Sequence, residues 1–539
     1  MRSGERIGRW LARHLSHDAS GPQAGILASL DEHFNLRYLS DRLQFEKSAI
    51  AEYLTSAKSR LESAGKRDAS DIRISVVSPV YGIPIKYVQR YIRSLRNQTH
   101  QRWELCLCVD GDPDPRIRRF LDKLSREEPE RFLLTVHSSN QGICAATRDA
   151  LTLASGDVVA FVDTDDTLHP EALNVIAHGF ASDPEIDIVY TNHDILTPWG
   201  YRIDPVYKPG WSPELIMACN YITHLATIRK SCLDKVDGLW SEAVNGCQDW
   251  DFLLRAAPLA RRIHHAPLVL YHWRAIGGSE ATRGKPWAWG AARMLQENHL
   301  SRIDKRLRWD FSDGENPPHL AFRNGVAPRL KIFLLGRGPA EEAAAQRLKS
   351  LRYPGETKLV QCEQPQGTLE EMAATLDGLV QSETEVNGSG ELLWFVQGAL
   401  AEFTDFSRLE CLAAFTALTS TGACWPFYGP WRGAYGPEDG LMQPRDRQTG
   451  FFTSWSANTL TGPLNGLMTT TGAWQSLGGF RALVDQMPGP QPLDALGALY
   501  GLAMLSRRQR NVSVNAIQSE WRPPVLDLGP RTPSVDPYR

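Results

Sequence analysis

An apolar run that ends in carboxylates constrains this chain more than any other feature. Residues 158–166 read VVAFVDTDD, so Asp163, Asp165 and Asp166 follow a continuous apolar segment. Such a segment is typical of a buried parallel strand. Carboxylates at its end are suitable ligands for a divalent cation, and a cation held there can bind a diphosphate. The alternative is that these acidic residues are solvated caps.

A second acidic cluster opens a segment with helical character. Residues 247–255 read CQDWDFLLR and place Asp249 and Asp251 in the expected first turn. Acidic residues there stabilise a helix through its dipole, which is the structural alternative. The functional interpretation is that Asp249 is a general base.

The segments before these clusters alternate between strand and helix patterns. Residues 72–80 form a β-branched run broken by Pro79 and Gly82, and residues 103–110 form a second run that ends at Asp110. Between these two runs, Val88, Ile92 and Leu95 are apolar residues that recur at helical spacing. Further on, Asn140 and Gly142 open a segment whose helix N-terminus can face a phosphate. This order predicts an α/β fold.

From Ile72 to Ser279 the chain resembles the family-2 glycosyltransferases of the GT-A fold, with the motifs in the family's order. The resemblance implies a Rossmann-like mixed sheet and inverting, metal-dependent transfer of a sugar. The implied donor is a nucleotide-diphosphate sugar (UDP-, GDP- or dTDP-linked), and the implied cofactor is Mn²⁺ or Mg²⁺. The implied acceptor is a glycan or lipid-linked glycan, as in bacterial surface-polysaccharide (O-antigen-like) synthesis.

The same resemblance assigns roles to residues of this sequence. Asp249 is the expected base, and the expected metal ligands are Asp163, Asp165 and His272. The expected donor contacts are Pro79, Tyr81, Asp110, Asn140, Gly142, Arg148, Asp163, Asp166, Arg274 and Ser279. The expected sugar and acceptor contacts are Lys208, Trp211, Asn220, Tyr221, His224, Gln248, Trp250 and Asp251.

Some of these positions have structural alternatives or depart from the family's pattern. Arg148 is alternatively a surface arginine, His272 a core histidine, and Trp211 and Tyr221 core or rim aromatics. The family more often has two adjacent aspartates where this chain has Val109-Asp110, and Gln248 replaces a common glutamate.

Composition narrows the class of protein. With 539 residues, 42% of them hydrophobic, two or three domains are expected, and no apolar run approaches the roughly 20 residues of a membrane span. A net charge of -3 argues against nucleic acid as a partner. The nine cysteines are scattered, which indicates a reducing, cytoplasmic compartment.

The N-terminal segment is basic and amphipathic. Residues 1–16 alternate arginines with apolar residues, which suits contact with the inner face of the cytoplasmic membrane, or a helix docked on the protein. Residues 1–70 are predicted to be helical and to serve packing or homo-oligomerisation.

The second half resembles a decayed copy of the first. Gln397 and Ala399 stand where Asp163 and Asp165 are expected, and Pro492 stands in place of Asp249, so a cation and a base are both lost. The alternative is an unrelated α/β domain, and its aromatic residues either bind a glycan or fill an interface. The predicted domains are a helical segment (1–70), a catalytic GT-A domain (71–305), a linker (306–327), a degenerate GT-A-like domain (328–522) and a Pro-rich tail (523–539).

Two other functional classes remain open from the sequence. A sugar nucleotidyltransferase shares an acidic metal site on such a sheet, but it does not need Asp249. A non-catalytic glycan-binding scaffold fits the second half alone.

Overall fold

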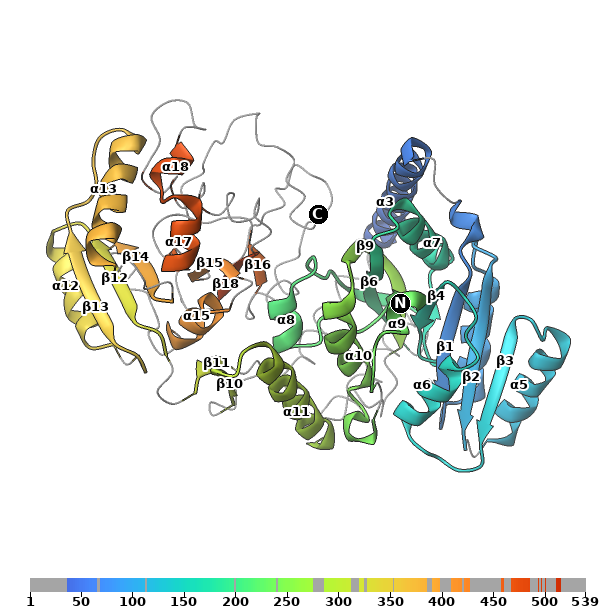
Figure 1. Cartoon of the computed structure of the whole chain (residues 1–539). Coiled ribbons are helices and arrows are strands. Elements are labelled where there is room, and N and C mark those ends of the chain that lie inside the picture. Colours follow the sequence, from blue (N-terminus) through green and yellow to red (C-terminus); the bar gives the residue numbers. More distant parts are fainter. Residues whose placement is uncertain are drawn as a thin grey trace. The chain divides into compact units, whose positions relative to one another are not determined.

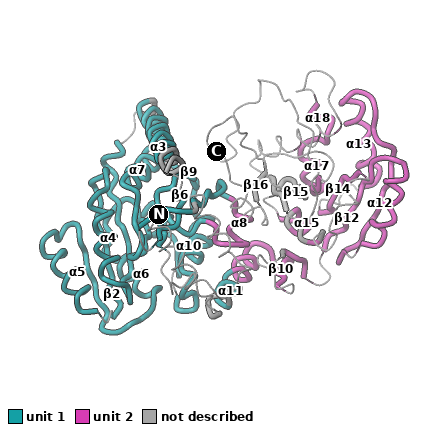
Figure 2. The backbone as a smooth tube through the Cα atoms, turned by 180° about the vertical axis from the view of Figure 1, so that it is seen from behind, with its two compact units in different colours: residues 1–211, 222–295 teal, residues 212–221, 296–539 magenta. Residues whose placement is uncertain are grey.

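The structure is a computed structural model, and it describes a subset of the chain. The described residues are 36–64, 68–111, 114–197, 200–238, 241–274, 286–311, 319–323, 327–351, 353–384, 390–397, 409–418, 421–426, 457–459, 467–484, 493, 496, 500 and 510–514. The predictions for residues 1–16, Ser279, Ala399, Pro492 and the tail from 523 fall outside them. The chain forms two compact units: unit 1 comprises residues 1–211 and 222–295, and unit 2 comprises 212–221 and 296–539 (Figure 2).

Unit 1 is built on one mixed sheet with helices packed against it (Figure 1). Its strands are β1 Ile74–Val80, β2 Trp103–Asp110, β3 Phe132–His137, β4 Val158–Phe161, β5 Thr167–Leu168, β6 Ile186–Leu196, β7 Arg202–Val206, β8 Ala226–Arg229 and β9 Arg262–Arg274. Its helices are α3 Leu36–Ala64, η1 Ala69–Asp71, α4 Ile85–Arg96, α5 Pro115–Glu127, α6 Ile143–Leu151, α7 Ala172–Ser182, α9 Lys230–Leu233, η2 Glu242–Val244, α10 Gln248–Ala256 and η3 Ala257–Leu259. The strand order is β3-β2-β1-β4-β8-β6-β9-β5, and β7 pairs with β6.

The predicted strand, helix, strand unit is confirmed as β1, α4 and β2. Every residue of β2 is buried, as expected for a strand covered on both faces. The helix α4 buries Val88, Ile92 and Leu95 against this sheet. Because β1 lies parallel to both β2 and β4, the carboxyl ends of these strands meet at one edge.

A tight approach of two loops shapes that edge. Gly111, directly after β2, has φ +65°, and a Cβ there would lie 2.5 Å from the main chain of Ser139 and Asn140. Only glycine fits such a position without moving the backbone. The loop at 139–142 is thereby brought against the end of β2.

The long helix α3 belongs to unit 1. Its presence confirms the prediction of a helix within the first 70 residues. The helix packs on α7. The partly buried side chains of Ala49, Tyr53, Leu54 and Leu61 pack against the core of unit 1. Among the residues that the structure describes, no helix is long and apolar enough to cross a membrane.

Unit 2 has its own sheet, core and helices. Its strands are β10 Leu307–Asp310, β11 His319–Phe322, β12 Leu330–Leu335, β13 Thr357–Cys362, β14 Leu392–Gln397, β15 Thr421–Pro426, β16 Ala457–Thr459, β17 Met468–Thr470 and β18 Arg510–Val514. Its helices are α8 Pro213–Ala218, α12 Pro339–Lys349, α13 Leu369–Glu383, α15 Leu409–Thr416, α17 Thr471–Leu477 and α18 Arg481–Val484. The helix α11, Pro286–Ile303, spans the boundary between the units in the sequence.

The sheet of unit 2 repeats the topology of the sheet of unit 1. Its order is β13-β12-β14-β17-β15-β18-β16, and the first six strands correspond to β2-β1-β4-β8-β6-β9. The five pairings between them run parallel, parallel, antiparallel, antiparallel and parallel in both units. The two sheets therefore share strand order and direction across six strands.

The register of the two sheets also agrees. Phe161 pairs with Val77 in unit 1, and Phe395 pairs with Phe333 in unit 2. Gln397 and Asp163 each lie two residues beyond these phenylalanines, at the same edge. Gln397 therefore lies at the strand position in unit 2 that corresponds to that of Asp163 in unit 1.

Candidate functional site

The acidic loop after β4 meets a histidine from the segment before β8. Ligand atoms of Asp163, Asp166 and His224 all lie within 4.8 Å of one another. The loop follows the carboxyl end of β4, and His224 is brought beside it because β8 pairs antiparallel with β4. Two carboxylates and an imidazole form a donor set that a divalent cation accepts.

Two groups from β9 hold Asp166 in place. This carboxylate is fully buried, and it accepts hydrogen bonds from the Tyr271 hydroxyl and, at 2.6 Å, from the main-chain N–H of Arg274. The Arg274 side chain also donates from Nε to the main-chain oxygen of Asp165 at 2.5 Å. The acidic loop is therefore fixed by the end of β9.

The electrostatics of the cluster favour a bound cation. Burial and repulsion from Asp163 raise the pKa of Asp165 to about 6. Burial and the other two carboxylates raise the pKa of Asp166 well above its ordinary value. Burial lowers the pKa of His224 to about 4, so its imidazole is neutral near pH 7 and keeps a lone pair. A positive ion would relieve the crowding of the carboxylates.

His272, the predicted metal ligand, lies elsewhere. Side chains alternate between the faces of a strand, and Tyr271 is directed to the acidic cluster. His272 instead pairs through Nδ1 with Asp194 at 2.7 Å. Arg202 bridges Asp194 to Glu46 of α3, with hydrogen bonds of 2.8 to 3.0 Å. The structure thus gathers His224 into the cluster, whereas His272 belongs to a charge network reaching α3.

Lys208, predicted to line the sugar cleft, is 1% exposed. Its Nζ donates to the main-chain oxygen of Thr191 at 2.6 Å and to that of His224. Burial lowers its pKa well below the ordinary value. This side chain holds the main chain that carries His224.

The predicted base, Asp249, is partly exposed in the first turn of α10. It lies near enough to His224 for its charge to oppose the fall in the pKa of that imidazole. Asp251 has a different environment, because it is buried and accepts from Arg255 Nε at 2.6 Å. Of the two aspartates, Asp249 is therefore the one that solvent can reach.

Asp110, predicted to contact the nucleotide, organises the neighbouring loop. Its carboxylate accepts from the main-chain N–H groups of Gln141 and Gly142 at 2.8 and 2.9 Å. His137 bridges Asp110 and Asp149 through its two ring nitrogens at 2.7 and 2.8 Å. Burial opposes charge on His137, but the two carboxylates outweigh it and raise its pKa.

The other predicted donor residues differ in exposure. Tyr81 is 51% exposed beyond the end of β1, and Pro79 O accepts from the Thr164 hydroxyl at 3.2 Å. Arg148 is exposed and lies 3.5 Å from Asp149. Arg274 is 1% exposed and stacks over the ring of Tyr87, and its Nη1 has no hydrogen-bond partner among the described residues. A buried guanidinium N–H without a partner is suited to an anion.

The predicted acceptor residues fall in both units. Trp211 belongs to unit 1 and is half-buried, whereas Asn220 and Tyr221 belong to unit 2. Tyr221 is 2% exposed, and its hydroxyl accepts from the main-chain N–H of Ser212 at 3.0 Å. Trp250 is buried and Gln248 half-buried, both in α10. Tyr221 and Trp250 thus have the burial of packing residues.

Sequence reasoning missed several contributors. It gave no role to Tyr271, to His137 and Asp149, or to Asn245, whose Oδ1 accepts from the N–H of Cys144 at the start of α6. It placed His224 with the acceptor rather than the cation. Successive side chains of a strand point to opposite faces, and this rule could have shown that Tyr271 and His272 face different ways. No local sequence pattern indicated that His224 lies beside Asp163.

Comparison with known proteins finds matches to part of the chain, which includes residues 75–234. Residues 75–234 match the family "Glycosyl transferase family 2". The uncharacterized protein y4gI of Sinorhizobium fredii is 36% identical over 247 residues, which are 45% of this chain and 27% of that protein. The O-antigen biosynthesis protein RfbC of Myxococcus xanthus is 33% identical over 211 residues, 39% of this chain and 16% of RfbC.

These matches cover only part of each relative. The chain spans about a quarter of y4gI and about a sixth of RfbC. Among solved structures, S. aureus TarS 1-349 aligns with a TM-score of 0.34 and 20% identity, over 43% of this chain and 66% of that one.

Proposed function

Since residues 75–234 form a glycosyl transferase family 2 domain, we propose that the protein transfers a sugar, with inversion, from a nucleotide-diphosphate sugar to a hydroxyl of a glycan. One observation carries the proposal. The cluster of Asp163, Asp166 and His224 lies at the carboxyl ends of the parallel strands, and Asp249 lies beside it. Ligands of open α/β sheets bind at this edge.

The cation would be held by Asp163, Asp166 and His224, because these residues offer two carboxylate oxygens and a neutral imidazole. When bound, a divalent ion offsets the negative charge that develops on a departing diphosphate. The raised pKa values of Asp165 and Asp166 support this proposal, since crowded buried carboxylates are stabilised by a positive ion.

Two elements of the chain would position the donor. Arg274 brings a buried, unpartnered N–H to the acidic loop, where it would donate to a phosphate oxygen. The loop of Gln141 and Gly142 leads into α6, and Asp110 fixes its backbone. A rigid loop at a helix N-terminus suits a phosphate.

Asp249 would act as the general base. The acceptor hydroxyl oxygen attacks the anomeric carbon, and the bond from that carbon to the diphosphate oxygen breaks. The hydroxyl proton passes to Asp249, and the nucleoside diphosphate leaves with the bonding electron pair. Because a single in-line step forms one bond as the other breaks, the configuration inverts.

Unit 2 is proposed to be a tandem copy that has lost catalysis. It repeats six strands of the topology, and Gln397 occupies the position of Asp163. A neutral amide is a poor substitute for a metal-binding carboxylate. The name of the relative from Myxococcus xanthus supports a surface glycan of the O-antigen type as the product.

The test is a donor panel of UDP-, GDP- and dTDP-sugars with Mn²⁺, scored for the phosphate product. Release of nucleoside diphosphate that depends on Asp163 and Asp249 supports sugar transfer. A parallel panel supplies nucleoside triphosphates and sugar 1-phosphates in place of the nucleotide sugars. Release of pyrophosphate from that second panel would instead identify the runner-up, a sugar nucleotidyltransferase. No donor turnover in a protein that binds glycan would favour the scaffold.

A further inference from the structure

One side chain joins the loop of the proposed donor site to the helix of the proposed base. Asn245 lies between η2 and α10, and its Oδ1 accepts a hydrogen bond from the main-chain N–H of Cys144 at 3.2 Å. Cys144 is the second residue of α6, and Asp249 is the second residue of α10. The bond joins residues 101 positions apart and therefore connects the beginnings of two helices that are distant in the sequence.

The same amide lies against the backbone of Gly142, directly before α6. A Cβ at Gly142 would lie 3.0 Å from Asn245 Nδ2 and 3.2 Å from Asn245 Oδ1. Gly142 has φ +93°, a conformation that glycine adopts without strain. Because no side chain stands in the way, the amide of Asn245 contacts both the loop at 139–142 and the first turn of α6.

The α6 side of this contact is held by other residues as well. Asp110 accepts hydrogen bonds from the main-chain N–H groups of Gln141 and Gly142, and α6 packs against β1 and β2. Within α6, the N–H of Ala146 donates to Gly142 O at 3.0 Å. We therefore expect the loop at 139–142 to keep its place when Asn245 is replaced.

On the other side, the contact lies close to the carboxylates of α10. Burial raises the pKa of the Cys144 thiol to about 12, and the nearby charges of Asp251 and Asp249 add to the rise. The segment before α10 turns at Gly246, which has φ +85°. The side chain of Asn245 thus ties this turn, and the first turn of α10 that follows it, to the start of α6.

The rest of α10 is anchored by its apolar face. Phe252 and Leu254 are buried, and the ring centroids of Phe252 and Phe161 lie 4.9 Å apart. Asp249 is only partly buried and lies in the first turn, ahead of these anchors. The place of its carboxylate therefore depends on what holds that first turn, and Asn245 supplies one such bond.

We propose that Asn245 is a positioning residue, which sets the place of the Asp249 carboxylate relative to the loop at 139–142. This inference rests on the proposed function, in which that loop faces the diphosphate of the donor and Asp249 takes the acceptor proton. When the bond is lost, the loop still binds the donor, whereas the first turn of α10 shifts. A misplacement of about 1 Å at the reacting groups can cost roughly 100-fold in rate.

The experiment compares Asn245→Ala with the wild-type protein in two assays. Calorimetry with UDP, GDP or dTDP in the presence of Mn²⁺ measures binding to the donor site. Single-turnover release of nucleoside diphosphate from the matching nucleotide sugar, with water as the acceptor, measures the step that Asp249 assists. The rate should fall about 10-fold or more, and the affinity should change by less than about 2-fold. A residue that only stabilised the fold would lower the bound fraction and the rate together.

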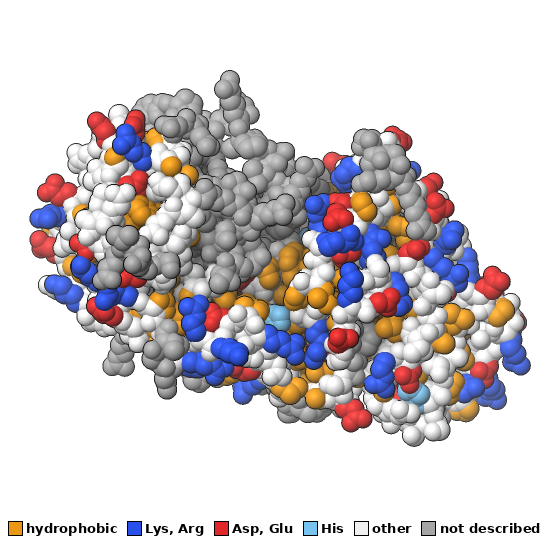
Figure 3. Space-filling view, in the orientation of Figure 1, with side chains coloured by type: hydrophobic (Ala, Val, Ile, Leu, Met, Phe, Trp, Pro, Cys, Tyr) orange, Lys and Arg blue, Asp and Glu red, His pale blue; other side chains and the backbone are white. Residues whose placement is uncertain are grey.

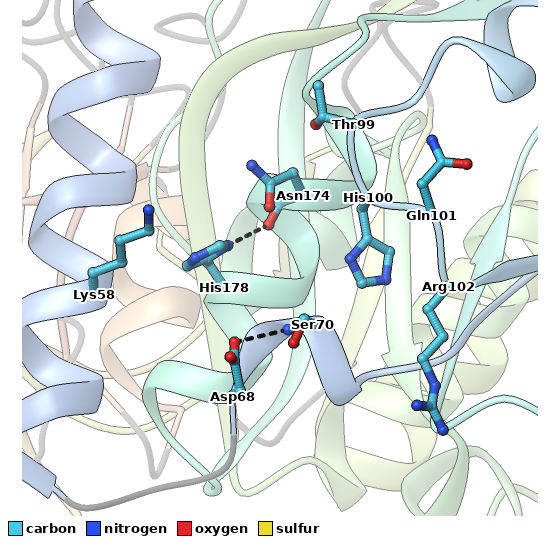
Figure 4. A pocket seen from close by; sticks show the side chains of 9 residues that line it. All are labelled: Lys58, Asp68, Ser70, Thr99, His100, Gln101, Arg102, Asn174 and His178. Atoms are coloured by element: carbon cyan, nitrogen blue, oxygen red, sulfur yellow. Dashed lines mark hydrogen bonds between the residues drawn. The ribbon is translucent and has the colours of Figure 1, made fainter.

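A conservative variant and a matched control make the result specific. Asn245→Asp keeps an oxygen that can accept from the Cys144 N–H, so at saturating donor it should recover about half or more of the wild-type rate. The control comes from a depression of about 700 Å³ at the amino ends of β1 and β2 (Figure 4). There Asp68 accepts from the main-chain N–H of Ser70 at 3.0 Å, a bond of the same kind. Asp68→Ala should leave both the rate and the affinity within about 2-fold.

Three results would overturn the inference, and they differ in what else they overturn. Equal rates of Asn245→Ala and Asp68→Ala in an active protein would show that Asn245 does not position the base. A parallel loss of nucleotide affinity and rate in Asn245→Ala, which Asn245→Asp does not restore, would make Asn245 a donor contact or a structural residue. Both results leave the proposed function intact. A wild-type protein that binds none of UDP, GDP and dTDP and turns over no nucleotide sugar would overturn the proposed function and this inference with it.

Discussion

The Nζ of Lys208 donates a hydrogen bond to the main-chain oxygen of His224. Lys208 follows β7 in the sequence. Its hydrogen bond fixes the segment that brings the His224 imidazole to Asp163 and Asp166. The side chain is buried, and its second bond, to Thr191, ties the same group to β6. We expect Lys208 to be a positioning residue for the cation site.

Lys208→Met should therefore weaken Mn²⁺ binding by about 10-fold and lower the stability by about 1–3 kcal/mol, because two buried carbonyls lose their donor. Calorimetry with Mn²⁺ and chemical denaturation measure the two effects. The control is Thr227→Val, which removes another buried bond, from Thr227 to Val189 O, without touching His224. Equal loss of Mn²⁺ affinity in both variants would mean that Lys208 acts only through stability.

The choice between His224 and His272 at the cation is directly testable. His224→Gln should weaken Mn²⁺ binding by about 10-fold or more, because the imidazole is one of three candidate ligands. His272→Gln should change Mn²⁺ affinity by less than about 2-fold, since its Nδ1 pairs with Asp194 away from the cluster. The reverse ranking in titrations would restore the assignment made from the sequence.

Asp249→Asn should keep donor binding but lower transfer by roughly 100-fold or more, the scale expected of a general base. Single-turnover kinetics with a bound donor separate these quantities. The control is Asp251→Asn, which loses charge in the pair with Arg255 and should affect stability more than chemistry. Near-normal transfer by Asp249→Asn would rule this residue out as the base.

The bridge of His137 between Asp110 and Asp149 predicts a dependence of stability on pH. The folded pKa of His137 is raised above its ordinary value of 6.5, so charged His137 stabilises the fold fully below that pH. The stabilisation is lost as the pH rises through the folded pKa. His137→Gln should cost about 1–3 kcal/mol near pH 5.5 and less near pH 9, measured by urea denaturation. An equal cost at both values would show that the charge on His137 contributes nothing.

Gln397 tests the proposed loss of catalysis in unit 2. Gln397→Ala should leave the transfer rate within about 2-fold, because an amide at this position holds no cation. Asp163→Asn in the same preparation should abolish Mn²⁺-dependent transfer. If Gln397→Ala removed an activity that Asp163→Asn retained, unit 2 would be catalytic.

Figure 3 shows the distribution of charged side chains on one face of the described residues. Lys and Arg side chains are interspersed with Asp and Glu in the view of Figure 3. This agrees for that face with the net charge of -3. The exclusion of nucleic acid as a partner stays a prediction.

The sequence by itself determined the local structure and the position of the acidic loop. Residues 105–109 read LCLCV, and a continuous apolar run of this kind is typical of a strand that is buried on both faces. Carboxylates after a strand must lie at its carboxyl end, so Asp163 and Asp166 were placed without knowledge of the rest of the fold. The same local rules, applied to both halves, predicted that Gln397 corresponds in sequence to Asp163, and the strand orders of the two sheets support this correspondence.

Only the tertiary structure decided which distant groups meet that loop. His224 reaches it because β8 pairs antiparallel with β4, and Tyr271 reaches it while its neighbour His272 faces Asp194. Asp110 likewise binds a loop backbone about 30 residues later. Such contacts depend on strand order and on which face of a strand is turned inward. These are properties of sheet packing between segments far apart, and no local pattern of residues encodes them.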